Sequence, residues 1–180
     1  MSKRFAFIGV LVLSLVCVAG CGAPDPPTGE EAAAASDAAS TSGDRLAPEF
    51  TLARIGGGEQ VSLADSAGRI RLVDFWTTWC PPCREEIPML NELQQTYGER
   101  GFDVIAISPE EPDVLEEFAA DNPVVYTSLI GTEDLVHEYG ALGYPTGFLI
   151  DGDGYVVDVF FGPKPRRALE EKIEALLAES

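Results

Sequence analysis

Histidine is almost absent from this chain of 180 residues, and cysteine occurs only four times. His137 is the one imidazole, and Cys80 and Cys83 form the one Cys-x-x-Cys pair. A structural zinc site needs about four cysteine and histidine ligands, and the sequence has no second pair to complete one. The scarcity argues against a zinc-binding module, so we expect no metal ion and no cofactor.

Basic side chains and long apolar runs are also scarce. The chain has 12 Lys and Arg against 30 Asp and Glu, a formal net charge of −18. A protein so acidic repels polyanions, which argues against nucleic acid and anionic lipid surfaces as electrostatic partners. The apolar run at residues 5–16 is shorter than the roughly 20 residues of a membrane-spanning helix.

That run instead belongs to an export signal. Lys3 and Arg4 precede it, and Val18-Ala19-Gly20 leads directly to Cys21, which resembles the lipobox of bacterial lipoproteins. We expect a signal peptide over residues 1–20 and a lipid anchor on Cys21, where two acyl chains would hold the protein at a membrane. An ordinary signal peptide cleaved nearby is the alternative. Residues 21–44 then carry the anchor and a flexible acidic linker, and residues 45–180 the folded domain.

The domain is organised around residues 76–83, Trp-Thr-Thr-Trp-Cys-Pro-Pro-Cys. The mostly apolar residues 70–75 predict a buried strand that delivers the cysteines to its carboxyl end. Pro82 favours a helix that starts there. A helix N-terminus stabilises a thiolate, so Cys80 is expected to be exposed and to act as the nucleophile, with Cys83 one turn inside. The alternative is a structural disulfide, but so short a ring constrains little chain entropy.

Strands and helices are predicted to alternate along the domain. The predicted strands are residues 50–54, 60–63, 70–75, 102–107, 124–130, 146–150 and 155–160. The predicted helices are residues 82–97, 113–120, 133–139 and a last one around residues 169–177. The alternation predicts an α/β domain with parallel βαβ units, and glycine-rich turns at residues 56–58 and 151–154 predict two hairpins.

In this order of elements the sequence resembles the thioredoxin superfamily, and within it the membrane-anchored TlpA/ResA type of thiol-disulfide oxidoreductase. Residues 73–83, Pro88 in the following helix and Gly143-Tyr144-Pro145-Thr146 carry the likeness to thioredoxins. Residues 47–50, the opening hairpin and the extra segment 113–130 resemble the TlpA/ResA subgroup. The resemblance implies a central mixed sheet with helices on both faces, an N-terminal β-hairpin and an inserted helix-strand segment.

The resemblance also implies catalytic roles. Cys80 would attack a substrate disulfide, and Cys83 would resolve the mixed disulfide, so that the pair forms the redox-active disulfide. Asp74 matches the buried carboxylate of thioredoxins, where proteins of the TlpA/ResA type often have a neutral residue. Burial raises the pKa of such a carboxylate, which can then accept the proton of Cys83. The alternative for Asp74 is a strand residue that faces solvent.

A substrate-binding surface is implied beside the cysteines. Pro145 matches the cis-proline of the family, where the backbone of Tyr144 can pair with a substrate strand. The expected surface consists of Trp79, Pro81, Pro82, Tyr144 and Pro145.

We therefore predict a lipid-anchored reductase of disulfides in exported proteins, located in the bacterial cell envelope outside the cytoplasm. The resemblance implies a membrane electron-donor protein that re-reduces it, and apocytochrome c among its substrates. One alternative is an oxidase that donates its disulfide. Another is a copper chaperone that uses Cys80, Cys83 and His137, although such chaperones space their cysteines one residue further apart.

Overall fold

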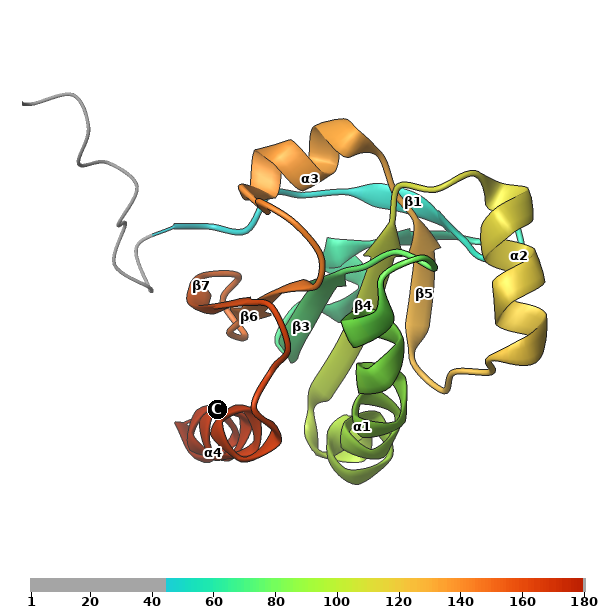
Figure 1. The fold of residues 1–180 in the computed structure, drawn as a ribbon. Helices are drawn as coiled ribbons and strands as arrows, with labels where there is room; N and C mark the ends of the chain where they lie inside the picture. Colours follow the sequence, from blue (N-terminus) through green and yellow to red (C-terminus); the bar gives the residue numbers. More distant parts are fainter. Residues whose placement is uncertain (1–44, 180) are drawn as a thin grey trace, which may run out of the picture. The chain divides into compact units, whose positions relative to one another are not determined.

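A computed structural model describes residues 45–179 of the chain. The predicted signal peptide, the Cys21 anchor and the acidic linker lie outside the described residues. Within residues 45–179, seven strands form one sheet in the order β2-β1-β5-β4-β3-β6-β7 (Figure 1). None of the helices in this part of the chain is long and apolar enough to cross a bilayer.

The strands and helices follow the predicted order. The strands are β1 (Thr51–Arg54), β2 (Gln60–Ser62), β3 (Ile70–Phe75), β4 (Phe102–Ser108), β5 (Thr127–Ile130), β6 (Thr146–Ile150) and β7 (Val156–Phe161). The helices are α1 (Pro81–Tyr97), α2 (Pro112–Asp121), α3 (Glu133–Tyr139) and α4 (Arg166–Glu179), with short 3₁₀ turns at Leu63–Ser66 and Gly98–Arg100. These elements confirm the predicted mixed α/β fold.

The central strand β3 positions the functional site. All six of its residues are buried, and it pairs in parallel with β4 and antiparallel with β6. Side chains alternate between the two faces of a strand, so Leu72 and Asp74 point to one face of the sheet and Val73 and Phe75 to the other. Asp74 lies opposite Gly147 of β6 in this register.

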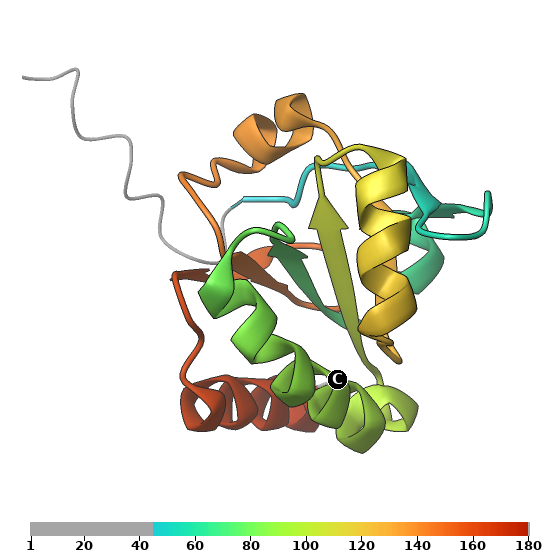
Figure 2. The ribbon, with the colours of Figure 1, turned by 45° about the vertical axis from the view of Figure 1, so that its right-hand side comes forward.

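Helices cover both faces of the sheet (Figures 1 and 2). Leu90 and Leu93 of α1, Leu115 of α2 and Leu169 of α4 pack in one apolar cluster with residues on the Leu72 side of the sheet. Helix α3 packs on the opposite face, in the cluster that contains Val73 and Phe75. The two apolar clusters hold β3 between them, because each face of a fully buried strand needs its own cover.

The strand expected at residues 124–130 is shorter in the structure and begins at Thr127. Pro123 has no backbone N–H for a sheet ladder. The N–H of Val125 donates instead to the side-chain carbonyl of Asn91 on α1, at 2.8 Å. The opening hairpin of β1 and β2 and the hairpin of β6 and β7 are both antiparallel, as predicted.

Candidate active site

Cys80 and Cys83 form a disulfide at the N-terminus of α1, with an S–S distance of 2.07 Å. Cys80 is the N-cap residue, and its Sγ accepts a hydrogen bond from the backbone N–H of Cys83 at 3.3 Å. Pro81 and Pro82 occupy the first helical positions and lack an N–H. The N–H of Cys83 is therefore the first donor of the helix that can reach the sulfur of Cys80.

The structure corrects the prediction that Cys80 is exposed. Both cysteines are only 3% exposed, and both belong to the apolar cluster that includes Trp76 and Leu90, with Tyr144 packed against it. The physical reason is the covalent bond, because it ties the Sγ of Cys80 to a residue inside the helix and turns the side chain into the core. In this oxidised form, the position at the helix N-terminus does not give solvent access.

The surface beside the disulfide brings together most of the predicted substrate-binding residues. The Tyr144–Pro145 peptide is cis, as the resemblance implies. Trp79 is 68% exposed, and its ring meets the ring of Tyr144 edge to face with 6.0 Å between centroids. Pro81 is exposed and Pro82 half-buried, whereas Pro145 is buried. The loop of Tyr144 and the start of α1 thus share one surface.

Asp74 is buried behind the disulfide, not exposed to solvent. It lies on the same face of β3 as Leu72 and Trp76, which pack in one cluster with both cysteines. Burial raises the pKa of Asp74, and the ammonium of Lys164 opposes this shift. Lys164 Nζ lies 2.6 Å from Asp74 Oδ1, so the buried carboxylate has a counter-charge that the sequence did not reveal.

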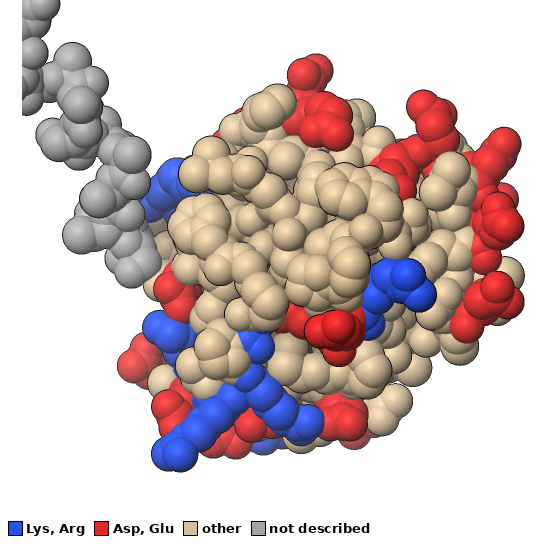
Figure 3. Space-filling model, in the orientation of Figure 1, with Lys and Arg blue, Asp and Glu red and all other residues tan. Residues whose placement is uncertain are grey.

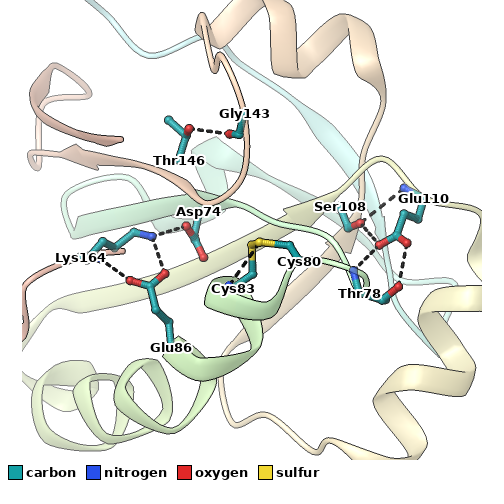
Figure 4. Close-up of a disulfide and its surroundings, with 10 residues drawn as sticks. All are labelled: Asp74, Thr78, Cys80, Cys83, Glu86, Ser108, Glu110, Gly143, Thr146 and Lys164. Carbon is teal, nitrogen blue, oxygen red and sulfur yellow. Dashed lines mark hydrogen bonds and ion pairs between the residues drawn. A yellow bond between two sulfur atoms is a disulfide. The ribbon is translucent and has the colours of Figure 1, made fainter. Parts of the chain in front are cut away.

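Glu86 and Lys164 are two buried charged residues that sequence reasoning missed. Lys164 Nζ also lies 3.1 Å from Glu86 Oε2, and the backbone N–H of Lys164 donates to Glu86 Oε1 (Figure 4). Helical spacing gave a signal for Glu86, because the buried stripe of α1 is Cys83, Glu86, Leu90, Leu93 and Tyr97. Lys164 precedes α4 and carries no such signal.

Glu110 anchors the loop that leads to Cys80, and sequence reasoning missed it as well. Its carboxylate accepts hydrogen bonds from the backbone N–H and the hydroxyl of Thr78, at 2.6 and 2.8 Å. The hydroxyl of Ser108, at the end of β4, donates to the same carboxylate at 3.1 Å. The loop before the disulfide is therefore tied to the end of the neighbouring strand (Figure 4).

Residues 45–179 contain no group of three or more His, Cys, Asp or Glu side chains that could hold a metal ion. His137 lies exposed on α3. The described residues therefore offer no cluster in which His137 joins Cys80 and Cys83 as a ligand set.

A disulfide that caps α1, the cis Tyr144–Pro145 peptide beside it and the mixed sheet beneath define a thiol-disulfide oxidoreductase with a thioredoxin-like fold. The sequence pattern of the Redoxin family matches residues 41–177. The chain belongs to this family, and within the thioredoxin superfamily it is of the ResA type.

Similar proteins and solved structures agree with this assignment. The chain is 33% identical over 132 residues to thiol-disulfide oxidoreductase ResA of Bacillus thuringiensis, which covers 72% of this chain and 76% of that protein. It is 31% identical to the thioredoxin-like protein YneN of Bacillus subtilis, over 71% and 76% of the two chains. A putative thiol:disulfide interchange protein DsbE from Chlorobium tepidum superposes with a TM-score of 0.69 at 35% identity, over 73% and 95%.

Proposed function

We propose that this protein is a lipid-anchored oxidoreductase that works outside the cytoplasm and reduces disulfides of exported proteins through Cys80 and Cys83. The observation that carries the redox role is the N-cap position of Cys80, whose Sγ accepts the N–H of Cys83. In the dithiol form the same donor and the helix dipole stabilise a Cys80 thiolate. Reduction must also free that sulfur from its bond to Cys83, which lets the side chain turn toward a substrate.

The reaction runs in two exchange steps. The Cys80 thiolate attacks one sulfur of a substrate disulfide, forms a mixed disulfide, and the other substrate sulfur leaves as a thiolate. Cys83 then attacks Cys80 Sγ, its proton passes to Asp74, and the bond between Cys80 and the substrate breaks with its electron pair on the substrate sulfur. Two electrons thus move from the dithiol to the substrate, and the protein returns to the disulfide form of the structure.

Exposed apolar side chains near the dithiol support a polypeptide substrate. Trp79 and Leu142 are the most exposed large apolar side chains of the described residues, and Leu142 precedes Tyr144 by two residues. The middle of the face in Figure 3 has mostly uncharged side chains although the chain is strongly acidic. An extended segment beside a substrate cysteine can place apolar side chains there while its backbone pairs with that of Tyr144.

The cellular setting is proposed from the sequence. The basic and apolar segment before Cys21 supports export and lipid attachment at the bacterial cell envelope. A reductase outside the cytoplasm needs a supply of electrons, which we assign to a membrane electron-donor protein. Apocytochrome c is a proposed substrate because the likeness to ResA-type proteins implies it.

Single cysteine variants test the order of attack. Cys80→Ser should abolish reduction of insulin disulfides, whereas Cys83→Ser should accumulate a mixed disulfide through Cys80, because only Cys83 can resolve it. Mass spectrometry of the trapped adduct identifies the linked residue. Alkylation of Cys83 before Cys80 by iodoacetamide in the reduced protein would reverse the assignment.

The reduction potential of the pair decides the direction of electron flow. A value near the roughly −270 mV of thioredoxin fits a reductase, whereas one near the roughly −120 mV of the oxidant DsbA fits an oxidase. Equilibration with glutathione or dithiothreitol buffers, followed by thiol counting, measures this potential. An oxidising value would overturn the proposed reductase role and leave the exchange chemistry in place.

A further inference from the structure

A single buried ammonium joins two buried carboxylates behind the disulfide. The side chain of Lys164 has no exposed surface, and its Nζ contacts Asp74 Oδ1 and Glu86 Oε2 at 2.6 and 3.1 Å. The backbone N–H of Lys164 holds the other oxygen of Glu86. Figure 4 shows the ammonium reaching both carboxylates, with the Cys80–Cys83 pair on the far side of Asp74 in this view.

Two features of the surrounding backbone place the side chain of Lys164: the prolines on either side of it and the space at Gly147. Lys164 follows β7 and stands between Pro163 and Pro165, whose rings fix their own φ angles and restrict the residue before each of them. Gly147 provides the space, because a Cβ at this position would overlap the Cε of Lys164. Gly147 is also the strand partner of Asp74. Two separate features of the chain therefore serve the placement of this ammonium.

The net charge of the cluster allows it to accept one proton. Two carboxylates and one ammonium sum to one negative charge when all are ionised. Burial raises the pKa of Asp74 and of Glu86, and Lys164 opposes both shifts. The pKa of Lys164 is raised because the pull of Asp74 and Glu86 outweighs burial, so Lys164 keeps its proton at neutral pH.

The other titratable groups near the cluster do not supply charge at neutral pH. Burial, with smaller contributions from Asp74 and Glu86, raises the pKa of Tyr126 well above its ordinary value. Tyr126 therefore stays neutral. Cys83, on the turn of α1 before Glu86, is the group of the dithiol that must lose a proton in the resolving step. Asp74 lies between the ammonium of Lys164 and the disulfide in the view of Figure 4.

We propose that Lys164 is a positioning residue that keeps the carboxylates of Asp74 and Glu86 both ionised, so that one of them can accept the proton that Cys83 releases. The inference rests on the proposed function and deepens its second step. The S–H bond of Cys83 breaks, the proton moves to a carboxylate oxygen of the pair, and the sulfur forms its bond to Cys80 Sγ as the substrate sulfur leaves with its electrons. Without the ammonium, the two adjacent buried carboxylates already share a proton before the resolving step. The pair can then no longer accept the proton of Cys83.

Stopped-flow reaction of the reduced full-length chain with DTNB tests this role in a Cys17→Ala, Cys21→Ser background, so that only the active pair reacts. A first thionitrobenzoate is released at a rate that depends on DTNB concentration and reports attack by Cys80. A second is released at a concentration-independent rate and reports resolution by Cys83. The pH profile of the second phase is the readout.

Lys164→Met should move the midpoint of this profile upward by about one pH unit and slow the second phase about tenfold at neutral pH, with recovery in alkali. Glu86→Gln should move it downward, because one carboxylate then pairs with one ammonium and becomes a weaker base. Lys172→Met is the matched control. It removes a lysine that pairs with Asp158 at the surface, and its profile should equal that of the parent.

Opposite shifts for Lys164→Met and Glu86→Gln support the proposal, and either shift alone supports it if the other variant does not fold. A uniform loss of rate with an unmoved midpoint in the folded variants would overturn it, because a merely structural lysine acts equally at every pH. Cys80→Ser distinguishes the two proposals. Loss of the first, DTNB-dependent phase in that variant supports Cys80 as the nucleophile whatever the Lys164 variants do, and a first phase by Cys83 at the rate of the parent would overturn the proposed function instead.

Discussion

Gly147→Ala is a test of how tightly Lys164 is packed over Asp74. Gly147 lies in β6 with its backbone paired to Asp74 of β3. A methyl group there would overlap Lys164 Cε and lie 3.3 Å from Leu72 Cδ1. Since Lys164 is buried and held by two carboxylates, its side chain cannot swing into solvent to make room. The ammonium must move away from Asp74, or the strand must shift.

The expected loss of stability follows from two opposing effects. Overpacking a close-packed core costs about 1–3 kcal/mol, while alanine restricts the unfolded chain and returns about 0.4–1 kcal/mol. At the midpoints of these ranges the free energy of unfolding falls by about 1.3 kcal/mol, and at the extremes by about 0 to 2.6 kcal/mol. The midpoint loss lowers the melting temperature of a domain of this size by roughly 5 °C. Urea unfolding followed by circular dichroism measures the free energy, and thermal melting checks it.

Gly57→Ala provides the matched control for Gly147→Ala. Gly57 lies in the turn between β1 and β2, and a Cβ there meets no atom within 4 Å. It should be neutral or slightly stabilising, because only the unfolded-state effect remains. In a Lys164→Ala background, Gly147→Ala should cost less than in the wild type because the overlapping Cε is gone. Equal stability of Gly147→Ala and Gly57→Ala would refute the packing argument.

Two further predictions concern Asp74 and Cys21. The raised pKa of Asp74 means that folding binds a proton, so the ionised carboxylate destabilises the protein as pH rises from about 3.9 to the folded-state pKa. The melting temperature of Asp74→Asn, relative to that of the wild type, should therefore increase as the pH rises through this range. A difference in melting temperature that stays constant from about pH 4 to 9 would contradict this. Cys21→Ser should move the protein from the membrane to the soluble fraction with an unchanged melting curve. A wild-type protein without acyl mass in mass spectrometry would contradict the lipid anchor.

Local patterns in the sequence were sufficient to predict the elements of the fold. The boundaries of β3 and α3 agree with the predicted ones, because a mostly apolar run of six residues marks the strand and the N-cap Thr132 and Gly140 flank the short amphipathic helix. The late start of β5 was not predictable in this way. It depends on Asn91, 34 residues earlier, which takes the N–H of Val125.

The candidate site was only partly predictable from the sequence. The Cys-x-x-Cys pair and the cis-proline loop carry local motifs, so their neighbourhood followed from resemblance. The burial of Cys80 did not, because it comes from the packing of the disulfide in a cluster of residues that lie far apart in the sequence. The counter-charge of Asp74 did not either, because Lys164 stands 90 residues away and lies in a loop without periodicity.

Two irregularities in the sequence nevertheless point to that missing lysine when they are taken together. Glu86 places a carboxylate on the buried stripe of α1, and Gly147 leaves a gap in a buried strand directly beside Asp74. A buried acid without a partner and a buried glycine without a turn are each unfavourable alone. A cation that fills the gap removes both penalties at once, since it neutralises the acid and occupies the space. Two locally unfavourable residues that one distant side chain can stabilise therefore indicate where that side chain lies. Such unfavourable residues are expected at functional sites.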